Sequence, residues 1–201
     1  MPVKPSRILH RTARNPFVLD TRELGRRPGT MRTVRREIAA PAGLRSALVG
    51  VPDGAPLVLD LRLESVTEGV LVTGTPSVTV PTEGECGRCL GPVTTELVVD
   101  VCELFAYPDS VTDETAGADE VDRIVDDLID VEPVVRDAVV LGLPVTPLCR
   151  ANCAGLCPDC GQRLDDLPAG HTHHKIDPRW AGLADFLEPA PAITTETGSQ
   201  E

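Results

Sequence analysis

The feature that most constrains the fold of this chain is the run from Cys149 to Gly161, which reads C-R-A-N-C-A-G-L-C-P-D-C-G. Four cysteines fall within it at the spacing C-x3-C-x3-C-x2-C. Its second half has the form of a zinc knuckle, in which a tight turn directs two thiolates at one ion and a glycine lets the chain turn back. A second pair, Cys86 and Cys89, stands far upstream. Any fold for this chain must therefore arrange two distant groups of thiols.

Two combinations of these thiols could supply the four ligands that a structural zinc ion takes. In the first, the upstream pair and the knuckle pair, Cys157 and Cys160, close one four-thiolate site across the intervening positions 90–156. Such a link would tie the C-terminal segment to the upstream strands and close a long loop. In the second, the four cysteines of the run form a local site by themselves. Paired C-x2-C knuckles are the commoner pattern, which favours the first combination without excluding the second.

The first combination leaves Cys149 and Cys153 over. His171 and His173 follow the run and could complete a second site with them, with two thiolates and two imidazoles. A solvated, flexible loop is the plainer interpretation of these histidines. The seventh cysteine, Cys102, lies in an apolar stretch and is expected to be an ordinary buried thiol. The candidate metal ligands are Cys86, Cys89, Cys149, Cys153, Cys157 and Cys160, with His171 and His173 as further candidates.

The composition indicates a globular protein of the reducing cytoplasm. Of the 201 residues, 41% are hydrophobic but only 2% are aromatic, so the core must be built from Val, Leu and Ala. Residues 1–20 contain no apolar run of the kind that a secretory signal needs, and no stretch reaches the roughly 18 apolar residues of a membrane span. We therefore expect a cytoplasmic protein with no membrane partner, in which reduced thiols bind metal rather than form disulfides.

The hydrophobic pattern predicts a meander of antiparallel strands. Leu57 to Leu63 alternates apolar and polar residues, which is the period of a half-buried strand. Glu68 and Gly69 then mark a hairpin turn before further strand-like stretches at 70–74, 78–80 and 97–104. The Cys86/Cys89 pair falls on a turn between two of these strands.

Helical signals appear only in the last third of the chain. Val134 to Leu143 carries an apolar face, with Asp130 as a plausible N-cap and Pro144 as the stop signal. Residues 177–187 have helical spacing as well. We expect an α+β, mainly β fold: a small antiparallel barrel or sandwich with one or two short helices and a C-terminal, cysteine-rich, zinc-binding segment.

Composition divides the chain into five expected parts. They are a disordered basic tail at 1–15, an antiparallel β body with the first cysteine pair at 16–108, an acidic flexible loop at 109–121, a helix plus the cysteine cluster packed on the body at 122–188, and a disordered tail at 189–201.

Positive charge is concentrated at the start of the chain. Residues 1–45 hold 11 basic and 3 acidic residues, a balance of +8, whereas the remainder holds 8 basic and 28 acidic residues, a balance of −20. A basic arm on an acidic body suggests nucleic acid at one end, although a solvated tail is the plainer interpretation. The candidate residues for contact with nucleic acid or another partner are Arg22, Arg26, Arg27, Arg32, Arg35 and Arg36.

Four stretches together resemble the YceD family, the large ribosomal RNA subunit accumulation proteins. They are Cys86 to Leu90 (C-G-R-C-L), Asp130 to Pro144 with its L-G-L-P ending, Cys149 to Gly161, and Asp177 to Arg179. The resemblance implies a bacterial protein needed for normal levels of large-subunit ribosomal RNA, with no established enzymatic activity. This chain departs from the family pattern at residues 171–173, where His-Thr-His stands in place of a C-x-C.

The expected function is therefore that of a non-enzymatic factor in large-subunit rRNA accumulation or maturation. It would bind rRNA or a basic ribosomal protein and carry structural Zn²⁺. A cytosolic thiol redox sensor or oxidoreductase that uses its C-x2-C pairs is the main alternative. A nuclease that holds Mg²⁺ on Asp126, Asp127 and Asp130 is a weaker one.

Overall fold

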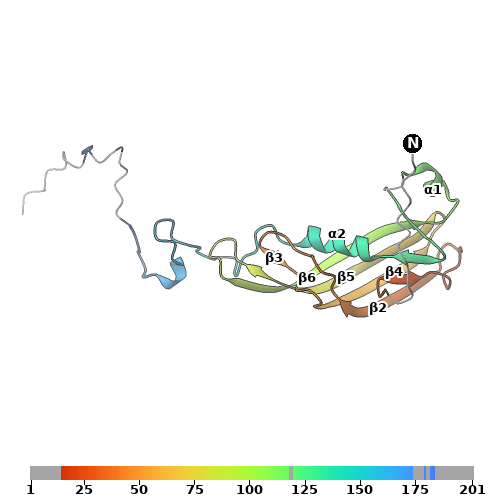
Figure 1. Ribbon diagram of the computed structural model, residues 1–201, viewed down its shortest axis with the longest axis horizontal. Helices are drawn as coiled ribbons and strands as arrows, with labels where there is room; N and C mark the ends of the chain where they lie inside the picture. The colour runs from red at the N-terminus through yellow and green to blue at the C-terminus, as the bar shows by residue number, and fades with distance from the viewer. Residues whose placement is uncertain (1–14, 118–119, 174–178, 180–181, 184–201) are drawn as a thin grey trace, which may run out of the picture. The chain divides into compact units, whose positions relative to one another are not determined.

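A computed structural model describes residues 15–117, 120–173, 179 and 182–183. The chain divides into two compact units, residues 1–155 and residues 156–201 (Figure 1). Three expectations, the two disordered tails and the helix near 177–187, fall wholly or mainly outside the described residues. No described helix is long and apolar enough to cross a membrane.

The first unit is built mainly of antiparallel strands. The strands are β1 (Val18–Asp20), β2 (Met31–Ala39), β3 (Val49–Gly50), β4 (Pro56–Ser65), β5 (Gly69–Glu85), β6 (Pro92–Ala106), β7 (Asp122–Arg123) and β8 (Leu128–Asp130). The helices are α1 (Val111–Thr115) and α2 (Glu132–Gly142), and the second unit contains a 3-10 turn, η1 (Leu164–Asp166). The large sheet has the order β2-β4-β5-β6-β7 with β3 also paired to β5, and β1 pairs with β8 in a small sheet.

Strand β4 is the centre of the core, as its alternating pattern predicts. Its inward residues Leu57, Leu59, Leu61 and Leu63 are fully buried. They share one apolar cluster with residues of β5, with Phe17, Leu19 and Ile129 from the segments around the small sheet, and with α2. The described strands form no closed barrel; two sheets and a helix packed around one core give a sandwich-like, mainly β fold.

Strand β5 is longer than the sequence suggests. The two expected strands at 70–74 and 78–80 are parts of one strand, interrupted by an irregularity between Gly74 and Val78. Ser77 satisfies the broken ladder there, because its Oγ donates to the Gly74 carbonyl at 2.7 Å and accepts from the Val101 N–H at 2.7 Å. A bulge of this kind keeps two long strands paired while it bends them.

Strand β2 forms one edge of the large sheet. It begins at Met31, within the segment that carries the candidate arginines, and pairs with β4 from Met31↔Glu64 to Ala39↔Pro56. Val34 is its buried residue and opposes Leu61. Pairing with a strongly patterned neighbour therefore overrides the weak local signal.

Helix α2 confirms the expected helix and lies against β6 on the inner face of the large sheet. Val135 and Val139 are buried, and Gly142 approaches so closely that an added Cβ would lie 2.5 Å from Val99 Cγ1. The N-cap position is Val131, and the Asp130 carboxylate instead accepts from the Glu132 N–H at 3.1 Å. The chain that follows α2 then runs to the start of β6, at the tip of the β5–β6 hairpin (Figure 1).

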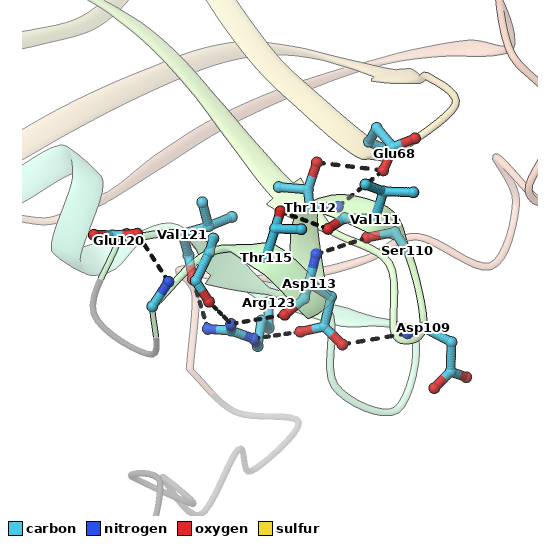
Figure 2. Close-up of polar contacts among 12 residues, drawn as sticks. Glu68, Asp109, Ser110, Val111, Thr112, Asp113, Thr115, Glu120, Val121 and Arg123 are labelled. Carbon is cyan, nitrogen blue, oxygen red and sulfur yellow. Dashed lines mark hydrogen bonds and ion pairs between the residues drawn. The ribbon is translucent and has the colours of Figure 1, made fainter.

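The acidic segment after β6 contains a short helix where we expected only a loop. Figure 2 shows how α1 is held: Ser110 Oγ accepts from the Asp113 N–H at 3.1 Å, and Glu68 accepts from the Thr112 N–H at 3.1 Å. Arg123 Nε donates to Asp113 Oδ1 at 2.5 Å. Glu68 and Arg123 lie outside the helix. The contacts that stabilise α1 therefore leave no periodic pattern in its own sequence.

Candidate metal centres

The first candidate centre begins at the tip of the β5–β6 hairpin. There Cys86 to Gly91 form a turn in which the Cys86 N–H donates to the Gly91 carbonyl at 2.7 Å and the Leu90 N–H donates to the Cys86 carbonyl at 2.9 Å. Leu90 closes the turn in the left-handed region, with φ of 56°. Cys86 and Cys89 are both buried by this arrangement.

The segment after α2 delivers two more cysteines to the same place. The Gly87 N–H donates to the Pro147 carbonyl at 2.8 Å, which fixes the approach two residues before Cys149. An added Cβ at Gly87 would lie 2.8 Å from Thr146, so a larger residue would push this segment away. Arg88 then donates from Nη1 to the Cys153 carbonyl at 3.1 Å. The hairpin tip thus holds both ends of the Cys149–Cys153 segment.

The four sulfur atoms lie at the spacing of a tetrahedral zinc site. Cys86 Sγ and Cys153 Sγ are 3.8 Å apart, Cys89 Sγ and Cys149 Sγ are 3.7 Å apart, and all four lie within 4.8 Å of one another. Zinc–sulfur bonds of about 2.3 Å in a tetrahedron place the sulfurs about 3.8 Å apart. All four are free thiols. This group, defined here as the four-cysteine group, can hold a metal ion.

The electrostatics of the four-cysteine group are uneven. Backbone N–H groups, first that of Cys149 and then that of Cys89, lower the pKa of Cys86 to about 6. Hydrogen bonding with Cys153 and burial raise the pKa of Cys149 to about 12. One thiol thus ionises readily while another resists, because several negative sulfurs in contact repel each other. A dication would remove that repulsion and hold all four as thiolates.

A second turn of the same form opens the second unit. The Cys157 N–H donates to the Gln162 carbonyl at 2.7 Å, and the Gly161 N–H donates to the Cys157 carbonyl at 2.8 Å. Gly161 has φ of 71°. Backbone N–H groups of Cys160 and Asp159 lower the pKa of Cys157 to about 7. This is the turn that the knuckle motif predicts.

Two histidines complete a second group of possible ligands. Cys160 Sγ lies 3.7 Å from His171 Nε2, and the ligand atoms of Cys157, Cys160, His171 and His173 all lie within 4.8 Å of one another. The sulfur–nitrogen distance suits a shared zinc ion. The two Nε2 atoms lie 2.7 Å apart, whereas zinc–nitrogen bonds of 2.0–2.1 Å would place them about 3.3 Å apart. The Cys2His2 group therefore fits a metal after a small separation of its rings.

This grouping differs from both combinations expected from the sequence. Cys86 and Cys89 join Cys149 and Cys153 rather than the knuckle pair, and the histidines join the knuckle pair rather than Cys149 and Cys153. The reason is the chain path: the contact at Pro147 brings Cys149 to the hairpin tip before the knuckle begins. The link that the sequence predicts between the knuckle pair and the upstream cysteines is thus replaced by a link within the first unit, between Cys149 and Cys153 and the hairpin tip.

Cys102 corrects a further expectation. The structure exposes this thiol instead of burying it. Its strand is apolar at consecutive positions, so the sequence does not show whether the odd-numbered or the even-numbered residues face the core. Cys102 lies on the outer face of β6.

The three acids of the proposed Mg²⁺ site have structural duties. Asp126 and Asp127 have φ of 54° and 59° and form the tight turn between Val125 and Leu128. Asp130 accepts from the first turn of α2. Among the described residues, the ligand groups that could hold a metal do not include them.

Most of the candidate arginines contact the chain itself. Three of them form ion pairs: Arg22 with Asp20 at 2.5 Å, Arg32 with Glu23 at 3.1 Å and Arg35 with Asp60 at 3.4 Å. Arg36 donates to the Pro16 carbonyl at 2.6 Å. The Arg26 guanidinium lies 4.9 Å from the centroid of the Tyr107 ring. Arg27 is exposed. Arg32 and Arg36 share one parity of β2 and Arg35 has the other, so the strand divides these three between two faces.

Three residues of the hairpin tip have structural roles that the sequence did not predict. Gly87 admits the Pro147 segment, Arg88 holds Cys153, and Leu90 closes the turn. Only the last had a detectable signal, because it occupies the position that Gly161 holds in the other turn.

Comparison with known proteins agrees with the motifs. The family model described as "Large ribosomal RNA subunit accumulation protein YceD" matches residues 75–187. An uncharacterised protein of Mycobacterium tuberculosis is 53% identical over 175 residues, which cover 87% of this chain and 83% of that protein. An uncharacterised protein of Mycobacterium leprae is 46% identical, over 91% of this chain and 83% of that protein. Bacillus subtilis YlbN is 27% identical over 51% of this chain and 59% of that protein.

No solved structure matches the chain. The family match spans more than half of the 201 residues and includes both candidate metal centres. The chain therefore belongs to the YceD family.

Proposed function

We propose that this protein supports the accumulation of large-subunit ribosomal RNA as a binding factor and not as an enzyme. Membership of the YceD family carries the proposal, since the family description names large-subunit rRNA accumulation. Its partner is large-subunit rRNA or a basic ribosomal protein, and its place of action is the cytoplasm, where ribosomes are assembled.

Zinc is the ion that we propose for both ligand groups, in a structural role. The support is the sulfur spacing of the four-cysteine group and the softness of its ligands. A full set of four protein ligands leaves no open position for a substrate or water. The metal would fix the segment after α2 to the hairpin tip and organise the second unit.

The charge distribution bears on which partner is bound. Arg26 and Arg27 are exposed, and no carboxylate within the described residues forms an ion pair with them, so their positive charges are available to phosphate. The rest of the molecule is strongly acidic, which disfavours extensive contact with RNA and favours a basic protein. We therefore assign any contact with RNA to the loop that carries these two arginines.

The test is capture of the tagged protein from cells at low and at high salt. We expect precursor particles of the large subunit to copurify at low salt. Contact through phosphates weakens steeply with salt, and an Arg26→Glu/Arg27→Glu variant should then lose the particles as well. Capture that survives both changes identifies a protein partner, whereas absence of the particles at both salt concentrations contradicts the proposal.

A thiol redox function is the second candidate, and the observation that favours it is the close approach of Cys86 Sγ to Cys153 Sγ, at 3.8 Å, beside the lowered pKa of Cys86. The two functions differ in metal content. Protein purified under reducing conditions with tightly held zinc supports the structural role. Metal-free protein with an accessible, reversible disulfide would support the redox role instead.

A further inference from the structure

Strand β6 forms an open edge of the large sheet along most of its length. It pairs with β5 from Pro92 to Ala106, but on its other side β7 pairs only with Phe105 and Ala106. Elsewhere along this side, no strand among the described residues pairs with β6. The open edge therefore runs from Pro92 to Leu104, along the side of β6 that faces away from β5 (Figure 1).

The direction of the backbone groups on this edge follows from three hydrogen bonds. The Val101 N–H and the Thr95 carbonyl bond to residues of β5, whereas the Ala106 carbonyl accepts from Ile124 on the side of β7. Successive residues of a strand point their N–H and C=O groups to opposite sides. The residues that direct these groups to the open edge are thus Thr94, Glu96, Val98, Asp100, Cys102 and Leu104.

Few of the usual protections cover this edge. Natural edge strands are short, or carry lysine or proline, which keeps other chains from pairing with them. The open stretch of β6 has no proline after Pro92 and no lysine, and Val98 at its middle is 50% exposed. Such an edge is a ready template for an added strand.

The charge of the edge selects what can pair with it. Strands β5 and β6 contain no Lys or Arg. Their carboxylates are Glu83, Glu85, Glu96, Asp100 and Glu103. Within the described residues none of these five forms an ion pair, although Asp60 and Glu64 on β4 both do.

We propose that the β6 edge binds an extended, basic segment of a partner protein, which adds to the large sheet as a further strand. Main-chain hydrogen bonds to β6 supply affinity, and lysine or arginine side chains at alternate positions meet the unpaired carboxylates. A second copy of this chain would bring the same acids face to face, and RNA would bring phosphates. The proposal rests on the proposed function, and it selects the basic protein over RNA as the partner at this surface.

The opposite edge of the sheet sharpens the prediction. Strand β2 carries Arg32, Arg35 and Arg36 and would repel a basic strand. Exposed Glu37 on β2 is therefore a matched position for a charge-reversal control at the wrong edge.

The experiment uses the full-length protein and a synthetic peptide in which lysine alternates with valine. Amide exchange should slow on peptide addition at Glu96, Val98, Asp100 and Cys102, while the intervening amides, already bonded to β5, change little. A Glu96→Lys/Asp100→Lys variant should weaken peptide binding by about tenfold or more, and Glu37→Lys should not. Higher salt should weaken binding by wild type.

Two further changes isolate the backbone contribution. Val98→Pro removes only an outward N–H, so the β5–β6 ladder stays intact and peptide binding should fall. A peptide whose alternate amides are N-methylated cannot complete the added strand. It should bind wild type no more tightly than the unmethylated peptide binds Val98→Pro. If the methylated peptide binds as tightly as the parent, attraction is merely between opposite charges and the proposal fails.

Two other outcomes also overturn it. Edge amides that are protected in the free protein, together with concentration-dependent dimers, would show that a second copy occupies β6. Edge amides protected in a monomer, and freed by deleting residues 1–14, would assign the edge to the chain's own basic arm.

Failure here is separable from failure of the proposed function. If wild type copurifies with large-subunit precursors but leaves the edge amides unprotected by peptide, only the edge proposal falls. If the peptide protects the edge but no precursors copurify, the rRNA role falls and the strand-binding surface remains.

Discussion

Leu90 and Gly161 occupy the same place in two turns of the same form. Each closes a cysteine turn with a positive φ, 56° at Leu90 and 71° at Gly161, and each donates its N–H to the carbonyl of the first cysteine. Glycine reaches this region without strain, whereas leucine does not. The side chain of Leu90 is 57% exposed, so packing returns little for that strain.

We predict that Leu90→Gly raises the free energy of unfolding of the zinc-loaded first unit by about 0.5–1 kcal/mol, because it removes left-handed strain. Urea unfolding at saturating zinc measures the change. The matched control is Gly161→Leu, which should weaken retention of the second ion. A destabilised Leu90→Gly variant would contradict the strain argument and would mean that the leucine side chain makes a stabilising contact.

The ion pair of Asp113 with Arg123 predicts a pH dependence confined to α1. The hydrogen bond from Arg123 lowers the pKa of the Asp113 carboxyl. The charged form is therefore favoured on folding, and its stabilisation is complete above the ordinary carboxyl pKa and lost as the pH falls below about 4. The protection factors of the Val111–Thr115 amides, which compare their exchange rates with those of an unstructured peptide at the same pH, should fall below that pH. In Asp113→Asn the same amides should have low protection factors at neutral pH already, with little further change on acidification.

At the scale of elements, the turn between Val125 and Leu128 shows how two acids can be structural. Asp126 and Asp127 both have positive φ, as a type I′ turn requires, and asparagine and glycine are the residues that suit it best. The turn places β8 beside β1, where Thr21 Oγ1 donates to the Asp127 carbonyl at 2.9 Å.

We therefore predict that Asp127→Gly raises the free energy of unfolding by about 0.5–1 kcal/mol. Asp127→Val should lower it, because a β-branched residue resists positive φ. Thermal unfolding of both variants measures the effect. A loss of stability in the glycine variant would show that the Asp127 side chain contributes more than its backbone does.

The strands and α2 could be predicted because their signals are local. Four leucines at a period of two identify β4, and Pro144 marks the end of the α2 pattern. The bulge in β5 could not be predicted, since Ser77 acts through Val101 on the next strand. Helix α1 could not be predicted either, because beyond its cap at Ser110 it is held by Glu68 and Arg123, which lie outside the helix.

At the scale of the whole molecule, the identity of the candidate ligands could be predicted but their partition could not. Cysteine and histidine are recognisable as ligands wherever they occur. Which of them meet depends on the length and direction of α2 and on the contact between Gly87 and Pro147. Those are tertiary facts with no counterpart in the spacing of the motif.

The partition predicts how zinc is lost from variants. We expect two zinc ions per chain in wild type, one for each ligand group. Cys86→Ser and Cys149→Ser should weaken the binding of the same ion, so the double variant should still retain the other ion. Cys157→Ser should weaken the binding of the second ion, and Cys102→Ser should retain both ions. Elemental analysis after dialysis against a chelator measures the retained metal.

The two sequence-based combinations give different patterns and so can contradict this partition. If Cys86→Ser and Cys157→Ser release the same ion, the upstream pair and the knuckle pair share a site. If Cys86→Ser releases none, the cysteine run is self-contained.

The partition also sets an order of events during synthesis. The hairpin tip with Cys86 and Cys89 is made early, but the four-cysteine group is complete only when Cys153 has been added, after β1 to β8 and α2 have all been made. The Cys2His2 group is complete only with His173. A growing chain could thus coordinate the first proposed ion fully only once its whole strand body exists, and the second only after that, so each binding event would report how far translation has gone.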